Sequence, residues 1–373
     1  MSNIQMILGL TPVKPVSPTQ VKPLPEFKPV DPTQLFGLEI ETERIPLIPD
    51  NYYVVGMTGM GDNSLRNVDG LHSWEYLTKP ADFPTTMTIL QRFFAKSKFT
   101  DKNFSERCSI HVHANVQDLT VTQLKSICFL YQVCERLLYG FIGQERESNI
   151  YCVPWNQTTL HYGLMDKLEN ILTLKRWMKY TGLNLLPLFV TGTIEFRHLH
   201  GTADLTKIAT WLQLIACIML AGKQANSEEL EKEITELNTN SEYRAFFYRI
   251  FREYSAALDT PELHSYLETG VMEAKYSLLT SVHKHTHINT SKTPQFFADM
   301  QRVPAAPGVN NPPEHLIIDD MHRDPDALRE RIQRQVGELR LRDLAQRQVT
   351  TQRINTRANQ NAAGGWGAGD GHI

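Results

Sequence analysis

The stretch that decides the fold is FGLEIETE, Phe36–Glu43. Its large and polar residues alternate with period two, which is typical of a β-strand with one apolar and one polar face. Because successive strand side chains point to opposite faces, Glu39 and Glu41 share a face and Ile40 points to the other. Two carboxylates about 6 to 7 Å apart on one strand face repel each other unless a cation lies between them. The stretch therefore predicts a strand that carries part of a divalent-cation site.

The same spacing of ionisable residues recurs in two further predicted strands. SIHVHANV contains His111 and His113, and GTIEFRHL contains Glu195 and Arg197. Carboxylates are hard ligands that suit Mg²⁺ or Mn²⁺, and Mg²⁺ typically completes its shell with waters and phosphate oxygens. An arginine beside a carboxylate offers a fork of donors for phosphate or carboxylate oxygens. The pairs indicate a site that holds a nucleoside triphosphate through a metal ion, with Glu75 of SWEYLTKP as a fourth carboxylate.

Each of these pairs also has a simpler interpretation when it is taken alone. A Glu-x-Glu strand is usually a solvated sheet face, a His-x-His strand is usually a surface strand or a satisfied core pair, and Glu-x-Arg is usually a surface ion pair. The conjunction favours a functional site, because all three pairs are flanked by large apolar residues. A buried charged face without a function would cost much free energy.

The composition is that of a soluble globular protein, with 41% hydrophobic and 21% charged residues among 373. The formal charge of -3 provides no general basic field, so nucleic acid is not an expected partner. The scattered cysteines form no CxxC pair, which favours a reducing, cytoplasmic location without a disulfide framework. The N-terminus predicts no secretory signal. The most apolar stretch, Ile208–Ala221, is shorter than a membrane span and predicts a buried helix.

The pattern of prolines, charges and apolar residues predicts five regions. They are a Pro-rich flexible arm (1–34), the main domain (35–290), a linker (291–323), a charged helix (324–350) and a disordered tail (351–373). Within the main domain, apolar residues at three- and four-residue steps predict helices behind each strand. The expected helices are Pro84–Phe94, Leu124–Phe141 with Thr120 or Thr122 as N-cap, Asp204–Gln224, and one or two within Ser227–Leu258.

Four segments resemble, in order and approximate spacing, the motifs of the amidoligase family, which belongs to the glutamine-synthetase-like carboxylate-amine ligases. They are FGLEIETE, DNSLRNVDGLHSWEYLTKP, CSIHVHANVQDLT and GTIEFRHLHGT, within about Leu35 to Ala221. The resemblance implies an α+β fold in which an antiparallel sheet carries the active site on one face and helices pack on the other.

The resemblance also implies roles for individual residues. His111 would be a metal ligand or a nucleotide contact, and Arg197 would face the transferred phosphoryl group. RESNIYC and KYTGLNLLP also resemble family segments and supply looser assignments to substrate or nucleotide binding. The implied metal ligands are Glu39, Glu41, Glu75, His111 and Glu195; the catalytic residues are Arg197, Glu41 and Glu195; the cofactor-binding residues are Arg197, His113, Lys179, Asn184 and Arg146.

The implied reaction is an ATP- and Mg²⁺-dependent ligation, with Mn²⁺ as a possible substitute. A substrate carboxylate attacks the γ-phosphorus to form an acyl phosphate, and an amine then displaces phosphate to leave an amide or isopeptide bond. The substrates would be small-molecule or peptide carboxylates and amines. The Pro-rich arm or the charged C-terminal helix could bind a protein partner, and a homo-oligomer is compatible with the family. No membrane partner is expected.

Two other classes of protein remain open at this point. A metal-dependent amide or phosphoester hydrolase would use the same residues to activate water without consuming ATP. A noncatalytic structural or binding relative would keep the fold and work through its termini. The absence of a GxxxxGK[ST] loop excludes a P-loop enzyme.

Overall fold

The computed structural model describes residues 2–279, apart from residue 25 and residues 46–53, 62–64, 66, 68–69, 144–145 and 159–163. Met1–Asn289 form one compact unit. The predicted linker (291–323), charged helix (324–350) and tail (351–373) lie outside the described residues and stay predictions.

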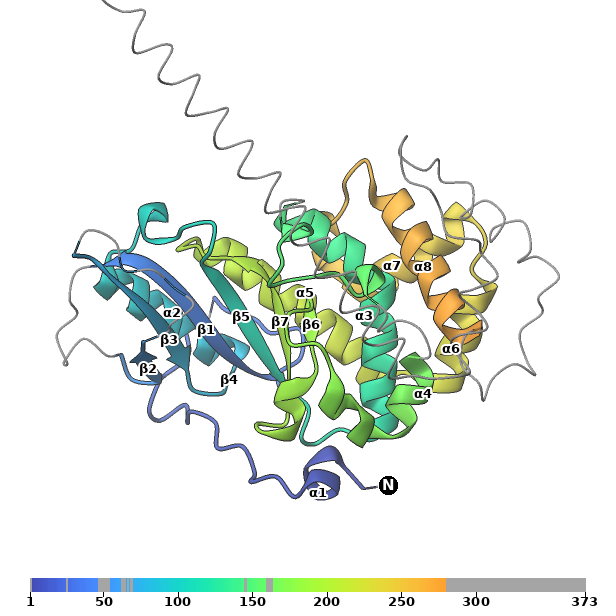
Figure 1. The fold of residues 1–373 in the computed structure, drawn as a ribbon, viewed down its shortest axis with the longest axis horizontal. Helices are drawn as coiled ribbons and strands as arrows, with labels where there is room; N and C mark the ends of the chain where they lie inside the picture. Colours follow the sequence, from blue (N-terminus) through green and yellow to red (C-terminus); the bar gives the residue numbers. More distant parts are fainter. Residues whose placement is uncertain are drawn as a thin grey trace, which may run out of the picture. The chain divides into compact units, whose positions relative to one another are not determined.

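Antiparallel strands form a single open sheet in the described part of the chain (Figure 1). The strand order is β2-β3-β1-β5-β7-β6, and β4 pairs with β1 at the start of that strand. The predicted strands at FGLEIETE, SWEYLTKP, SIHVHANV and GTIEFRHL are all present. The strands are β1 (Leu35–Ile45), β2 (Met57–Met60), β3 (His72–Thr78), β4 (Ala81–Asp82), β5 (Ser109–Asn115), β6 (Leu183–Asn184) and β7 (Thr193–His200).

The predicted helices are also present, and Ser227–Leu258 contains two α-helices. A capping box between Thr120 and Gln123 begins α3, which settles the choice of N-cap. Helix α8 was not predicted. The α-helices are α1 (Ile4–Leu8), α2 (Phe83–Ser97), α3 (Val121–Ile142), α4 (Leu164–Glu169), α5 (Leu205–Gln224), α6 (Ser227–Glu236), α7 (Asn240–Phe251) and α8 (Leu263–Leu279), and the 3₁₀ helices are η1 (Asp101–Asn103), η3 (Trp155–Gln157), η4 (Ile171–Arg176), η5 (Leu186–Phe189) and η6 (Arg252–Ala257).

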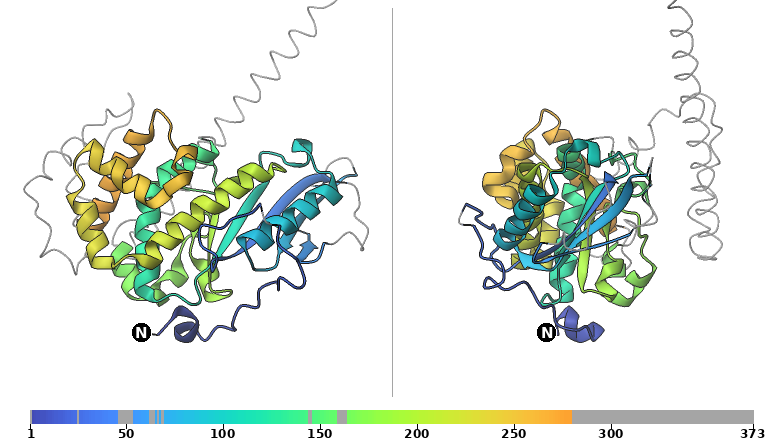
Figure 2. Two further views of the ribbon diagram at one scale, coloured as in Figure 1. Left: turned by 180° about the vertical axis from the view of Figure 1, so that it is seen from behind. Right: turned by 90° about the vertical axis from the view of Figure 1, so that its left-hand side faces the viewer.

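Helices cover the apolar face of the sheet, where α2 and α5 lie across the strands (Figure 2). The apolar alternation of β1 explains this layering, because Phe36, Leu38 and Ile40 are all at most 1% exposed. Helix α5 is the one described helix that is long and apolar enough to cross a membrane, and 61% of its most apolar window is buried inside the fold. The fold is therefore α+β, with an open antiparallel sheet and helices.

A β-bulge interrupts the regular pairing of β7 next to the residues that line the polar face. The pairing of β5 with β7 shifts between Ile110 and Val112, whose partners are Leu199 and Phe196. An extra residue in one strand bends it and re-aims the side chains next to it. Alternation from Glu195 places Arg197 on the polar face and His198 in the core among aromatic rings, and beyond these two residues the shifted register pairs the buried Leu199 with Ile110.

The N-terminal segment is not a flexible arm, so this prediction from its proline content is wrong for the described residues. The segment, coloured dark blue in Figure 1, contains helix α1 and then runs in extended form along the domain. Ile4 and Val21 are both 0% exposed. The backbone nitrogen of Val16 donates to the carbonyl of Pro80, and that of Leu24 donates to Thr88 Oγ1. Prolines remove backbone donors and prevent regular pairing, but they do not prevent apolar residues between them from being buried.

We expect Ile4→Ala to lower the free energy of unfolding by about 2–5 kcal/mol, because it leaves a cavity in the core. Chemical denaturation followed by circular dichroism measures this change. Ile7→Ala on the same helix is the matched control, because Ile7 is 44% exposed. Equal stabilities of the two variants would contradict the docked position of the segment.

Candidate active site

The register of the sheet brings the predicted pairs together on its polar face. Glu41 lies opposite Glu75 of β3, and Glu39 lies opposite His111 of β5. His113 in turn lies opposite Glu195 of β7. Sequence spacing placed these residues on polar faces of separate strands, and the strand order β3-β1-β5-β7 makes those faces continuous.

These side chains line a cavity of about 430 Å³. Its wall contains every residue to which the sequence analysis gave a metal-binding, catalytic or cofactor-binding role: Glu39, Glu41, Glu75, His111, His113, Arg146, Lys179, Asn184, Glu195 and Arg197. Asn149 and Cys152 of the loosely assigned segment RESNIYC are not in the wall. Tyr151 of RESNIYC and Tyr180 of KYTGLNLLP, which have the looser assignment to substrate or nucleotide binding, are also in the wall. The wall residues without an assignment from the sequence are Arg107, Ser109, Leu186, Pro187, Val190 and Thr191.

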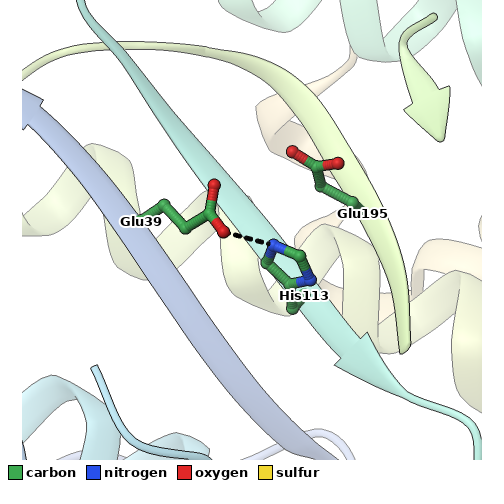
Figure 3. Close-up of side chains that lie close together, drawn as sticks. All are labelled: Glu39, His113 and Glu195. Carbon is green, nitrogen blue, oxygen red and sulfur yellow. Dashed lines mark hydrogen bonds and ion pairs between the residues drawn. The ribbon is translucent and has the colours of Figure 1, made fainter. Parts of the chain in front are cut away.

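Three of these residues form a candidate metal site. Ligand atoms of Glu39, His113 and Glu195 all lie within 4.8 Å of one another, and the three side chains come from adjacent strands (Figure 3). Two carboxylates and one imidazole suit a divalent cation, and the imidazole makes the set fit Mn²⁺ better than Mg²⁺. The sequence analysis assigned His113 to nucleotide binding, whereas the geometry places it among the candidate ligands.

Hydrogen bonds determine the proton position on the His113 ring. Thr191 Oγ1 donates to the carbonyl of Pro187 at 3.0 Å, so at its 2.8 Å contact with Thr193 Oγ1 it must accept. Thr193 Oγ1 therefore accepts from His113 Nδ1, 2.9 Å away. This leaves Nε2, which lies 2.9 Å from Glu39 Oε1, as the nitrogen that faces the cluster. A metal-binding histidine needs this arrangement, with one nitrogen held as a donor and the other directed at the ion.

His111 lies beside this cluster and is held in a similar way. Ser109 Oγ donates to Glu41 Oε2 at 2.6 Å, so it accepts from His111 Nε2 at 2.7 Å. The other ring nitrogen, Nδ1, lies 3.1 Å from a carboxylate oxygen of Glu39 and 3.3 Å from one of Glu195. His111 therefore directs Nδ1 at the same two carboxylates that His113 approaches.

Glu195 is the most constrained carboxylate of the site. Asn184 Nδ2 donates to its Oε2 at 2.6 Å, and Arg197 forms an ion pair with its Oε1. Burial raises the pKa of Glu195, but the nearby positive charges of His111 and Arg197 outweigh burial and lower this pKa below its usual value. Glu195 is therefore ionised at neutral pH, and both of its oxygens are held by partners within the protein.

Glu39 and His113 perturb each other in opposite directions. Burial raises the pKa of Glu39, but hydrogen bonds from His111 and His113 outweigh burial and hold this pKa well below its usual range. Burial lowers the pKa of His113, but the hydrogen bond and charge of Glu39 outweigh burial and raise it above its usual value. Without a metal ion, and at a pH below this raised pKa, the His113 imidazolium takes the place of a cation beside Glu39 and Glu195.

We expect Mn²⁺ affinity to rise with pH, because binding must displace the proton on His113 Nε2. Below the raised pKa of His113 the gain should be about tenfold per pH unit, and above it the affinity should level off. The carboxyl of Glu39 adds no proton in this range because its pKa is lowered. Calorimetric titrations between about pH 5.5 and 8 in buffers of different ionisation enthalpy count the released protons. An affinity independent of pH would exclude His113 as a ligand.

Two of the predicted cofactor-binding residues hold other parts of the site. Arg146 is 2% exposed and donates from Nε and Nη2 to the carbonyls of His198 and Arg197, so it braces the bulge of β7. Asn184 donates to Glu195 and accepts from the backbone nitrogen of Leu186. Both ends of the Asn184 amide are therefore used within the protein.

Cations and aromatic rings gather at the β7 side of the cavity. Lys179 Nζ and Arg197 Cζ lie 5.6 and 5.7 Å from the centre of the Tyr180 ring. Tyr180 also contacts Tyr151 edge to face at 5.4 Å, and the two rings are 40% and 42% exposed. The arrangement offers positive charge and an accessible aromatic surface next to the metal candidates.

The sequence analysis missed Ser109 and Thr193, although the signal for them was present. Both continue the period-two polar face of their strands, Ser109 before His111 and Thr193 before Glu195. Hydroxyls carry no charge, so a pattern of ionisable residues does not include them. Their function here is to orient the histidines.

In this α+β fold, a continuous cluster of carboxylates, histidines and an arginine lines a cavity on one sheet face and forms a candidate active site. Residues 62–219 match the model of a family described as "putative amidoligase enzyme". The matched segment contains β3, β5 and β7, and β1 precedes it. The match supports the family inferred from the motifs: over that segment the chain is similar to a putative amidoligase enzyme. No match was found among curated proteins.

Proposed function

We propose that this enzyme is an ATP- and divalent-metal-dependent carboxylate-amine ligase with a glutamine-synthetase-like sheet. The observation that carries the proposal is the placement of Glu39, His113 and Glu195 next to Arg197 in one cavity. A bound Mg²⁺ or Mn²⁺ would neutralise negative charge on the phosphate oxygens. Arg197 would donate to the oxygens of the transferred phosphoryl group, and Lys179 would add a second positive charge.

The chain's residues support both steps of the proposed reaction. In the first step, a carboxylate oxygen of one substrate forms a bond to the γ-phosphorus, and the bond to ADP breaks. In the second step, the amine nitrogen forms a bond to the acyl carbon, phosphate leaves, and the amine loses a proton. Glu41, which lies opposite Glu75 and lines the cavity, is the proposed acceptor of that proton.

A metal-dependent hydrolase is the second candidate, because the imidazole in the cluster also suits an ion that activates water. The deciding difference is nucleotide binding. Isothermal titration with a nonhydrolysable ATP analogue, with and without Mg²⁺, separates the two functions. Binding that requires Mg²⁺ and is lost in Glu39→Gln, which removes a candidate metal ligand, supports the ligase and justifies a search for ADP release with mixtures of amines and carboxylates. No binding under either condition would reject the ligase.

A further inference from the structure

The N-terminal segment reaches the candidate active site through one glutamine. Residues near α1 pair with the loop after β5, where the backbone nitrogens of Ile4 and Gln5 donate to the carbonyls of Leu119 and Gln117 at 2.8 and 3.0 Å. Further along, the backbone nitrogen of Val13 donates to the side-chain oxygen of Gln117 at 3.0 Å. The segment therefore holds both the backbone and the side chain of Gln117.

The amide nitrogen of Gln117 connects this segment to the turn before β7. Gln117 is 6% exposed, and its Nε2 donates to the carbonyls of Thr11 at 3.2 Å and Thr191 at 3.0 Å. A buried amide with its donors and acceptor all occupied fixes the groups that it contacts, because an unpaired buried polar group is costly. Gln117 thus ties Thr191 to the N-terminal segment.

Gly192 shows how closely these parts pack. Its φ of +65° is unfavourable for other residues, and an added Cβ would lie 2.4 Å from Gln117 Cγ and 2.9 Å from Leu10 Cδ1. The carbonyl of Gly192 also accepts from the backbone nitrogen of Val116 at 3.0 Å. The turn is therefore held by the N-terminal segment, by Gln117 and by the loop after β5.

We propose that the N-terminal segment and Gln117 are positioning elements for the metal centre, acting through the turn at Thr191–Thr193 on His113. The inference rests on the proposed function, because it requires His113 to bind a metal ion. Thr191 orients the hydroxyl of Thr193, and Thr193 accepts from His113 Nδ1. If the turn moves, the His113 ring loses the partner that directs Nε2 at the cluster, and metal affinity falls.

The chain offers a matched control for Gln117. Gln213 on α5 is also buried and also binds the N-terminal segment through both ends of its amide, accepting from the Val30 nitrogen and donating to the Lys28 carbonyl. None of the hydrogen bonds described for Gln213 reaches a residue of the cavity wall. Gln117→Met and Gln213→Met therefore each remove an amide that binds the N-terminal segment. Only Gln117→Met also removes the hydrogen bond to Thr191, which leads to His113.

The experiment is an isothermal titration of the full chain with Mn²⁺, at a temperature where circular dichroism shows both variants folded. We expect Gln117→Met to weaken Mn²⁺ binding about 10-fold, the effect typical of a lost outer contact to a metal ligand, and Gln213→Met to change it less than about 2-fold. Equal affinities in the two variants would overturn the proposal. If Gln117→Met does not fold, Leu10→Ala, which removes packing on Gly192, takes its place with the same expectation.

A second measurement separates positioning from a general loss of structure. Thr193→Val keeps the shape of the side chain but removes the acceptor for His113 Nδ1, whereas Thr193→Ser keeps the hydroxyl. We expect weakened Mn²⁺ binding in Thr193→Val and near wild-type binding in Thr193→Ser. Equal Mn²⁺ binding by Thr193→Val and Thr193→Ser would overturn the proposed positioning of His113 through the Thr193 hydroxyl. If the wild type itself bound no Mn²⁺, the proposed function would fail as well, whereas wild-type binding with an unaffected Gln117→Met would reject only the positioning role.

Discussion

Glu39→Gln should weaken Mn²⁺ binding by more than about 100-fold, since a direct ligand contributes more than the 10- to 100-fold of its outer contacts. Glu39 contacts both histidines, with oxygens 3.1 Å from His111 and 2.9 Å from His113. A neutral amide of the same shape cannot supply the negative charge that the ion requires. Titration with Mn²⁺ measures the loss, and circular dichroism confirms that the variant is folded.

Glu43→Gln on the same strand is the control for this substitution. Glu43 is buried, forms an ion pair with Arg107 at 3.7 Å and is not in the cavity wall. We expect Mn²⁺ binding by this variant to stay within a few-fold of the wild type. Wild-type affinity in Glu39→Gln would remove Glu39 from the metal site and leave the cluster without its proposed centre.

Arg197→Met should separate nucleotide binding from metal binding. A hydrogen bond to a charged group contributes about 1.5–3 kcal/mol, so affinity for the Mg²⁺ complex of a nonhydrolysable ATP analogue should fall about 10- to 150-fold. Affinity for Mn²⁺ alone should stay the same or increase, because Arg197 now neutralises the Oε1 oxygen of Glu195 that a metal ion would use. Paired titrations with the nucleotide and with Mn²⁺ measure the two effects.

The control is Arg107→Met, which removes an arginine from a different part of the same cavity wall. Arg107 pairs with Glu43, whereas Arg197 pairs with Glu195 of the candidate metal site. We expect a smaller loss of nucleotide affinity from this variant. If both variants lowered nucleotide affinity equally, positive charge in general, and not the position of Arg197, would explain nucleotide binding.

The amino-acid pattern was sufficient to predict the strands that carry the site. In β1, β5 and β7 the period-two alternation is strong, because one face of each strand packs on helices and the other lines a polar cavity. The same alternation predicted that Glu39, Glu41, Glu195 and Arg197 face one side. The short strands β2, β4 and β6 are too brief for a periodic signal.

The pairing between strands determined the roles of residues that their spacing in the sequence could not distinguish. His111 and His113 share a face and are equivalent in the sequence, yet the register places His113 opposite Glu195 and His111 opposite Glu39. Asn184 looked like a ligand contact, but it supports Glu195 because β6 pairs with β7 there. Register depends on contacts between residues far apart in the chain, which local periodicity does not record.

The N-terminal segment shows most clearly which properties follow from local sequence and which follow from tertiary contacts. Its prolines correctly indicated extended backbone over most of its length, since proline restricts φ and lacks a donor. Whether that backbone is free in solvent or packs against the domain depends on hydrogen-bond partners that are distant in sequence, such as Gln117, Thr88 and Gln213. Local composition thus determined the conformation of the segment, and only the tertiary contacts determined that it is buried against the domain and reaches the turn that orients His113.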